Sequence, residues 1–173
     1  MTRNNLDNQN CSVAQALEII GEWWTILILR EAFFGTRRFE DFQQHLNIAR
    51  NILTTRLRKL CEHGILTRVP VKEGAKRHEY RLTPMGKDLI VVVVALTQWG
   101  DRWLHSGEGA PVIFCDRETG EPIADVDLHS KDGRHLIPRQ IMLKPGPGAN
   151  IETQKRLQEI AKTWKIRQAL HDE

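Results

Sequence analysis

The stretch from residue 49 to residue 83 constrains the fold of this chain more than any other part of the sequence. Leucines recur at helical spacing in its first half, and Gly64 follows them where a left-handed residue commonly ends a helix. Two β-type runs come next, residues 65–71 and 78–82, with a glycine-containing basic loop between them. A helix with a polar outer face that is followed directly by a basic hairpin predicts a winged helix-turn-helix domain.

The outer face of the 49–64 helix is short, polar and poor in acids. The side chains expected on it, at 100° per residue, are Asn51, Thr54, Thr55 and Arg58, with Lys59 at the margin. Arginine is suited to guanine edges and asparagine to adenine edges in a major groove. Phosphate contacts are expected from side chains before the third helix, at the start of the 49–64 helix and in the wing: Arg37, Arg38, Arg50, Lys72, Lys76, Arg77 and His78.

Positive charge is concentrated around this predicted surface. Residues 35–81 hold 11 Lys and Arg against 5 Asp and Glu, although the whole chain of 173 residues has a net charge of only +3. Such a basic surface attracts the phosphate backbone of nucleic acid. The expected partner is double-stranded DNA with a pseudo-palindromic operator, and a winged helix that contacts only proteins is the alternative.

The residues before this stretch predict a disordered N-terminus and three further helices. Residues 1–10 are polar and rich in Asn, as disordered termini commonly are. A helix is expected from Ser12 to Gly21, and Gln15 completes a capping-box pattern with Ser12. The next helix, residues 23–34, is apolar nearly all round and should be buried at the centre. A brief third helix, residues 39–46, then leads through a tight turn into the 49–64 helix, which is helix-turn-helix geometry.

A long helix is expected from Pro84 to Leu104, with Thr83 as its N-cap. It carries more apolar surface than one face requires. We expect one side to pack on the domain and the other on a second copy of the chain, whereas a deeply buried core helix is the alternative. The candidate dimer-interface residues are Leu89, Val92, Val93, Leu96, Trp99 and Trp103.

The C-terminal part differs in character from residues 11–104. Residues 105–150 are expected to form a small β appendage, and residues 151–173 a helix capped by Asn150. Short strands are predicted at 112–115, 123–126 and 136–143. The fold class expected for the chain is therefore α+β, a winged helix-turn-helix domain with a long dimerisation helix, a β-rich appendage and a C-terminal helix.

The cysteines and the absence of catalytic motifs limit the classes of function. Three cysteines, far apart and odd in number, do not make a disulfide framework, which favours a cytoplasmic protein with reduced thiols. There is no C-x₂-C pair for a metal, no glycine-rich phosphate loop and no paired-carboxylate motif. No apolar run reaches the ~18 residues of a membrane span. We therefore expect neither an enzyme nor a membrane protein, and no cofactor or metal.

Several motifs in residues 11–104 recur in the order and spacing of a known family. They read IIGEWWTILILRE (19–31), GTRRFEDF (35–42), LTTRLRKL (53–60), GILTR (64–68), YRLT (80–83) and WG (99–100). This pattern resembles the HxlR-type bacterial transcription regulators. The resemblance implies a dimeric winged-helix DNA-binding regulator. It also implies a redox-sensing candidate, Cys11, because several family members sense electrophiles, quinones or oxidants through a cysteine at that place.

Two departures from the family pattern concern the helix-turn-helix. Glu22 stands where the family often has a base, and Ala49 stands where the family often has a serine. Loss of an N-cap hydroxyl costs about 1 kcal/mol, and Asn47 is an alternative cap for the 49–64 helix.

Arg56 points towards the flank of the apolar stripe, where an ion pair with Glu40 or Asp41 competes with a role in DNA binding.

The role of Cys11 has three interpretations. A helix N-terminus favours a thiolate, which suits a sensor of electrophiles. A free cysteine is also commonly a small packing residue. In the third interpretation, the signal is a small-molecule ligand in a pocket near the dimer helices.

Overall fold

The computed structural model describes residues 9–72, 77–104, 107 and 109–171. The chain forms two compact units. One comprises residues 16–126, and the other comprises the residues up to 15 together with those from 127 onward. This division differs from the predicted boundaries at residues 104 and 150, since part of the appendage belongs to the first unit.

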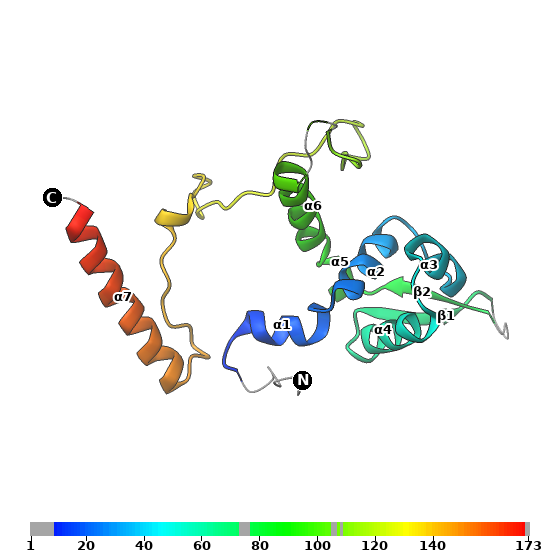
Figure 1. The fold of residues 1–173 in the computed structure, drawn as a ribbon, viewed down its shortest axis with the longest axis horizontal. Coiled ribbons are helices and arrows are strands. Elements are labelled where there is room, and N and C mark those ends of the chain that lie inside the picture. Colours follow the sequence, from blue (N-terminus) through cyan, green and yellow to red (C-terminus); the bar gives the residue numbers. More distant parts are fainter. Residues whose placement is uncertain (1–8, 73–76, 105–106, 108, 172–173) are drawn as a thin grey trace. The chain divides into compact units, whose positions relative to one another are not determined.

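The elements of the 16–126 unit follow the order of a winged helix-turn-helix domain, which confirms the predicted fold (Figure 1). They are α1 (Ser12–Ile20), α2 (Trp23–Phe33), α3 (Phe39–Leu46), α4 (Arg50–Glu62), β1 (Leu66–Pro70), β2 (His78–Leu82), α5 (Pro84–Lys87) and α6 (Ile90–Leu104). Strands β1 and β2 pair antiparallel, with Leu66 opposite Leu82 and Pro70 opposite His78. The α1 helix begins at Cys11–Ser12 and belongs only partly to this unit.

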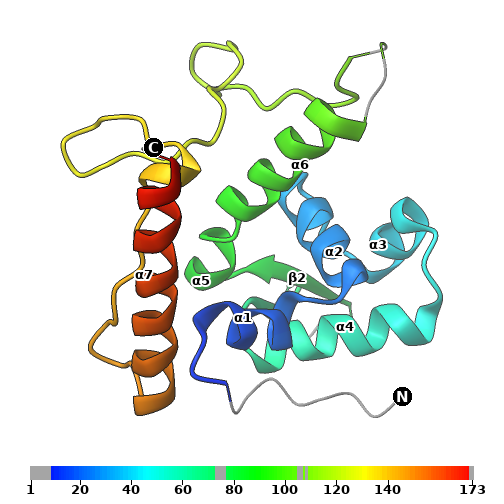
Figure 2. The ribbon, with the colours of Figure 1, turned by 60° about the vertical axis from the view of Figure 1, so that its left-hand side comes forward.

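Helix α2 is the central helix, as its all-round apolar sequence predicts. It contacts α3, α4, α6 and β2, and Figure 2 shows α6 running beside it. The buried core is built from these elements and consists of Ile28, Leu29, Phe42, Leu46, Ile48, Leu53, Leu57, Leu60, Ile65, Leu66 and Val93. Full burial of such a side chain contributes about 1.5–3 kcal/mol, so the inward face of α4 is firmly fixed.

The turn between α3 and α4 places Asn47 in the left-handed region, with φ 47° and ψ 42°. Asparagine tolerates this conformation better than most residues. The Asn47 amide donates to the carbonyl oxygen of Gln44 at 3.3 Å, which closes α3. Ala49 takes the N-cap position of α4 without a side-chain bond, as its sequence predicts. The alternative cap is wrong, because in the described contacts Asn47 serves the end of α3 and makes no side-chain bond to α4.

The predicted long helix is divided into α5 and α6, so the single helix from 84 to 104 is wrong. The Thr83 hydroxyl accepts from the Gly86 amide at 3.0 Å, as expected of an N-cap, and donates to the Gly64 carbonyl at 2.6 Å. The Leu89 amide then bonds to the Gly86 carbonyl, three residues back, at 3.2 Å. The physical reason is that α5 is anchored on the hairpin while α6 packs on α2.

The predicted strands of the appendage are also wrong. The described part of residues 107–150 contains two isolated bridges, Cys115 with Pro122 and His129 with His135, and a 3₁₀ turn, η1 (Pro138–Gln140). Every described residue there is at least partly exposed. These short alternating runs bury no face against a core. Burial therefore does not offset the conformational entropy that would be lost on forming a sheet.

The last helix, α7 (Ile151–His171), is capped as predicted, because Asn150 Oδ1 accepts from the Thr153 amide at 2.8 Å. In the same unit, Asn10 holds the start of α7. Its Nδ2 donates to the Gly148 carbonyl at 3.0 Å, and its Oδ1 accepts from the Asn150 amide at 3.0 Å. Asn10 is therefore ordered, whereas residues 1–8 of the predicted disordered N-terminus lie outside the described residues.

The described helices differ from membrane-spanning helices in length and apolarity. None of them alone has both the length and the apolarity to cross a bilayer, and the α1–α2 pair that has them together is bent by 76°.

Gly86 gives a test of how α5 is anchored. A Cβ at this position would lie 2.1 Å from the Ile65 carbonyl oxygen, which is backbone and cannot move aside. Gly86→Ala should therefore lower the free energy of unfolding by about 1–3 kcal/mol, measured by urea denaturation. Gly100→Ala is the matched control, since the space around a Cβ there is open and alanine favours a helix by up to about 1 kcal/mol. Equal effects of the two substitutions would contradict this packing.

Candidate nucleic-acid interface

Burial of the three leucines of α4 leaves its opposite face in solvent. Asn51, Thr54 and Arg58 on that face are exposed, while Thr55 and Lys59 are half-buried. All five predicted α4 residues are therefore accessible to a ligand as large as a DNA groove. The Arg58 side chain is 67% exposed and lies 3.7 Å from Glu62. An exposed pair of this kind is worth about 0.3–0.5 kcal/mol, so Arg58 can readily exchange it for another acceptor.

The two threonines are less free than their exposure suggests. Thr54 Oγ1 donates to the Arg50 carbonyl at 2.7 Å, and Thr55 Oγ1 donates to the Asn51 carbonyl at 2.9 Å. Both hydroxyl protons are thus directed into the helix. The oxygen lone pairs remain, so these residues can accept from base amino groups in the observed rotamers.

A hollow of about 700 Å³ lies between α3, the start of α4 and the hairpin. The arginines that line it are Arg38, Arg50, Arg68 and Arg77, and we call it the cationic groove. The Arg50 guanidinium lies 4.9 Å from the centre of the Phe39 ring, a cation–π distance that holds it at the groove. Glu40 and Asp41 also line the hollow and offset part of its charge.

Arg68 belongs to this groove although sequence reasoning missed it. Its Nη2 lies 3.2 Å from Nδ1 of His78, which is on the other strand and two residues out of register with Arg68. A signal was present in the sequence, because Arg68 is the one basic residue in the first β run and that run directly precedes the wing.

The structure separates the adjacent residues Arg37 and Arg38. Arg38 lines the cationic groove, whereas Arg37 lines a second hollow, and Tyr80 of β2 lines both. The reason is the backbone, since the Arg37 carbonyl accepts from the Tyr80 amide at 2.8 Å and this bond sets the link beside β2. Sequence reasoning could not distinguish the two arginines. Adjacent side chains of an extended segment point to opposite sides, but the sequence does not reveal what lies on each side.

The wing begins where the Val71 amide bonds to the Arg77 carbonyl at 3.0 Å. Lys72 and Arg77 are exposed at its base, and His78 is half-buried at the start of β2. Lys76, also predicted to contact phosphates, lies outside the described residues.

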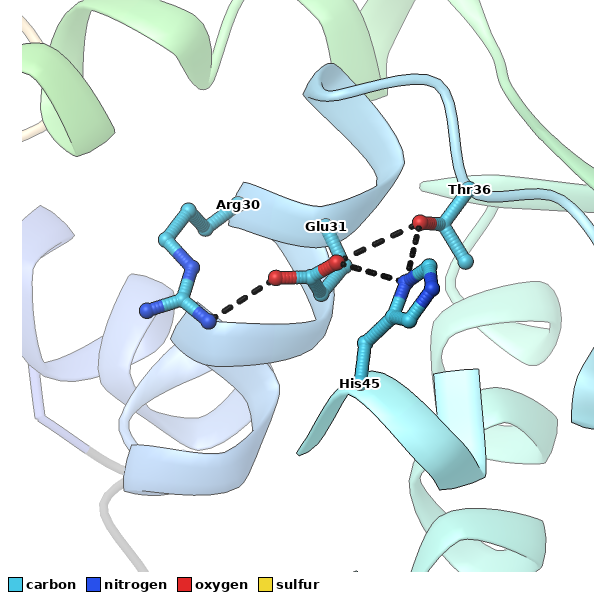
Figure 3. A network of polar contacts seen from close by, with 4 residues as sticks. All are labelled: Arg30, Glu31, Thr36 and His45. Atoms are coloured by element: carbon cyan, nitrogen blue, oxygen red, sulfur yellow. Dashed lines mark hydrogen bonds and ion pairs between the residues drawn. The ribbon is translucent and has the colours of Figure 1, made fainter. Parts of the chain in front are cut away.

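Buried Glu31 fixes α3 against α2 (Figure 3). Its Oε2 accepts from the Thr36 hydroxyl at 3.3 Å and lies 3.2 Å from Nδ1 of His45, while its Oε1 accepts from Arg30 Nη2 at 2.8 Å. The carboxylate therefore joins the end of α2, the link to α3 and α3 itself. Sequence analysis missed Glu31, whose only signal was an acid in an otherwise apolar helix.

A second ion pair explains one departure from the family pattern. Arg56 Nη2 lies 3.0 Å from the carboxylate of Glu22, so the predicted pairing with Glu40 or Asp41 is wrong. Glu22 is the acid that stands where the family often has a base. The pair is largely covered and joins the start of α2 to the middle of α4, which gives the acid a structural role.

The dimer-face candidates on α6 fall into two groups. Val93 is buried in the core and Leu89 packs against that core. Val92, Leu96, Trp99 and Trp103 are exposed, by 40%, 49%, 55% and 68%. Their spacing of three and four residues places them on one side of α6, as an apolar strip open to solvent.

The three cysteines occupy different environments. Cys11 and Cys115 are exposed, and Cys61 is half-buried beside the core. Burial raises the pKa of the Cys61 thiol, although nearby Arg68 opposes this. Within the described ranges, no three His, Cys, Asp or Glu side chains gather in a way that could hold a metal ion.

The sequence is similar to a known protein family and to individual regulators of bacteria. The family model HxlR-like helix-turn-helix matches residues 19–108. Rv3095, an uncharacterised HTH-type transcriptional regulator of Mycobacterium tuberculosis, is 45% identical over 137 residues, which span 79% of this chain and 87% of that protein. The uncharacterised HTH-type regulator sll1512 of Synechocystis is 34% identical over 70% of this chain and 91% of that protein.

Two solved structures also resemble the chain. PA1607, a candidate transcription factor, superposes with a TM-score of 0.75 at 37% identity, over 80% of this chain and 97% of that one. PA1374 of Pseudomonas aeruginosa, likewise a candidate transcription factor, gives a TM-score of 0.60 at 39% identity, over 84% of this chain and 99% of that one. These relatives are all described as regulators of transcription. The chain therefore belongs to the HxlR family of helix-turn-helix transcriptional regulators.

Proposed function

We propose that this protein binds a specific DNA operator as a homodimer and thereby regulates transcription. The observation that carries the proposal is the outward polar face of α4 beside the cationic groove. In a winged helix-turn-helix domain the second helix of the motif enters the major groove and the wing lies over the backbone. In that arrangement Asn51, Thr54, Thr55, Arg58 and Lys59 face the bases.

The groove arginines supply the phosphate contacts in this proposal. Arg38, Arg50, Arg68 and Arg77 surround one hollow next to the start of α4. Guanidinium groups bind phosphate oxygens in a bidentate fashion and hold the register of a protein on DNA without reading sequence. Lys72, Lys76 and His78 extend the basic surface along the wing. We assign Arg37 no phosphate contact in this proposal, because it lines the second hollow and not the cationic groove.

Two substitutions separate base reading from phosphate binding. Arg58→Ala should cost about 1–3 kcal/mol at one position in each half-site and relax the preference there, because a bidentate arginine–base contact is lost. Arg77→Ala should weaken binding to all sequences alike and reduce the slope of log affinity against log salt by about one.

The measurement is fluorescence anisotropy on fragments selected from random DNA, with the half-sites of the selected operator expected about one helical turn apart. Identical behaviour of the two variants would contradict the placement of helix and wing. Failure of the wild-type protein to bind any DNA would favour a domain that contacts only proteins.

The homodimer rests on the apolar strip of α6. Four exposed apolar side chains, two of them tryptophans, leave a contiguous patch that soluble monomers rarely present. A two-fold interface places the same patch of both copies together and thus covers it.

Leu96→Asp should convert the dimer to a folded monomer, because a charge would be buried in the interface and not in the domain core. Sedimentation equilibrium at micromolar concentration should show about 40 kDa for the wild type, twice the chain mass of 20.0 kDa, and about 20 kDa for the variant. Circular dichroism serves as the control for folding. A wild-type protein at 20 kDa would exclude this interface.

The signal in the proposal is an electrophile or oxidant that reacts with Cys11. The thiol is exposed and directly precedes α1, next to Asn10, which holds the start of α7. A modification at Cys11 would thus act where the N-terminal segment meets the C-terminal helix. The alternatives remain a packing role for Cys11 and a ligand near the dimer helices.

The Cys11 proposal is tested by labelling and by DNA binding together. Diamide or a quinone should change the operator affinity of the wild type and leave Cys11→Ser unaffected. Limiting electrophile should label Cys11 before Cys61, whose raised pKa and burial disfavour the reactive thiolate, as mass spectrometry of peptides would show. Cys115→Ser is the matched exposed control. A response that persists in Cys11→Ser would remove the sensing role.

A further inference from the structure

The second hollow in the 16–126 unit has features of a binding site for a small organic anion. It has a volume of about 450 Å³ and is formed by the end of α2, strand β2, helix α5 and the turn around Arg117. This size lies within the usual range for small-molecule sites. Tyr80 lines both this hollow and the cationic groove, but Arg37 lines only this hollow and Arg38 lines only the groove.

Four cationic side chains from four segments line this hollow, namely Arg37, Arg81, Lys87 and Arg117. Arg81 is paired with Glu79 at 2.9 Å. For the other three, the described contacts include no hydrogen bond or ion pair of the side chain. Among the residues that the structure describes, no carboxylate lines the hollow. Thr36 lines the hollow and donates to the buried carboxylate of Glu31, which also contacts Arg30 and His45. Glu79 already balances the charge of Arg81, but the other three cations have no acidic partner among the described contacts, and such a group favours an anion between them.

Arg117 is held at the hollow by the surrounding structure. The Phe114 ring contacts the Phe34 ring, with 6.5 Å between centroids, which attaches the turn to the end of α2. Within the turn, the Gly120 amide bonds to the Asp116 carbonyl at 2.8 Å. Further on, the Val126 amide donates to Gln98 Oε1 at 2.7 Å, which fixes the segment on α6. The fourth cation is thus supplied by a segment tied at both ends.

The wall of the hollow adds an apolar component. Phe33 and Leu82 line it between the cations, and both are half-buried. A compact inorganic anion would leave this surface in water, whereas a ring bearing a carboxylate would cover it and place its charge among the guanidinium groups. We propose that this hollow binds a small aromatic carboxylate as an effector of the protein.

Two adjacent residues connect this hollow with the proposed DNA-binding surface. Arg37 faces the hollow and Arg38 faces the cationic groove, and the two are adjacent in the link that leads into α3. A carboxylate held by Arg37 would fix this link and hence the direction of Arg38. This regulatory step rests on the proposed function, whereas binding of the anion does not.

Calorimetric titration of the full chain with 2-naphthoate tests the binding. We expect saturable binding, with the neutral analogue 2-naphthamide and inorganic phosphate each at least about tenfold weaker, because each lacks one of the two components. Lys87→Gln and Arg117→Gln should each weaken 2-naphthoate by about tenfold, and Lys131→Gln, an exposed lysine outside the hollow, should not. Absence of saturable binding, equal affinity for the amide or for phosphate, or an equal effect of Lys131→Gln would overturn the proposal.

A second measurement excludes the DNA backbone as the anion. Without ligand, Lys87→Gln and Arg117→Gln should bind the operator within about twofold of the wild type. A tenfold loss with a smaller salt slope would make the hollow part of the DNA interface and overturn the proposal. Saturating 2-naphthoate should change the operator affinity of the wild type but not of Arg117→Gln, and no change would overturn the regulatory step. Failure of all DNA binding would refute the proposed function and leave the calorimetric result standing.

Discussion

Burial of the leucine face of α4 against α2 is the constraint on which the remaining structure depends. Leu53, Leu57 and Leu60 are almost completely excluded from water and fix the rotation of α4 about its axis. Because the face opposite them must then point outward, the polar residues of α4 are exposed to solvent, and no further interaction is needed to orient them. The hairpin follows directly after Gly64, whose φ of 68° lets the chain reverse, so the wing is placed beside the same outward face.

Polar contacts act at the margins of this core and orient its helices. Glu31 binds three segments around the end of α2, and the Glu22–Arg56 pair joins the start of α2 to α4. Removal of one partner from a buried group of this kind costs more than the pair contributes, because the remaining group loses its solvation. Such contacts therefore add little net stability but restrict the ways in which α3 and α4 can pack on α2.

Residues 107–164 are ordered without a hydrophobic core. The described residues there are all at least partly exposed, and their order comes from local hydrogen bonds, from Asn10 at the start of α7 and from Gln98 at the end of α6. The solved relatives align over more of the chain than residues 16–126 contain, so part of this extension is shared with them. Its Arg117 nevertheless contributes to the second hollow of the winged-helix unit.

The sequence by itself determined the fold class, the family and the outward face of α4. Each of these depends on local periodicity or on motif spacing, which act over a few turns of one element. The inward leucines, the Thr83 cap and the Asn150 cap were all foreseen for this reason. The cationic surface was foreseen in outline, because charge counts do not require knowledge of the packing.

Only the tertiary structure decided which side chains meet. It divided the 84–104 helix into two, because α5 packs on the hairpin while α6 packs on α2. It gave Arg56 the partner Glu22, 34 residues away in sequence, and it placed Arg37 and Arg38 in two different hollows. It also moved Val93 from the candidate dimer face into the core. These outcomes depend on contacts between distant elements, which leave no periodic signal in the chain, and for that reason the second hollow could be recognised only in three dimensions.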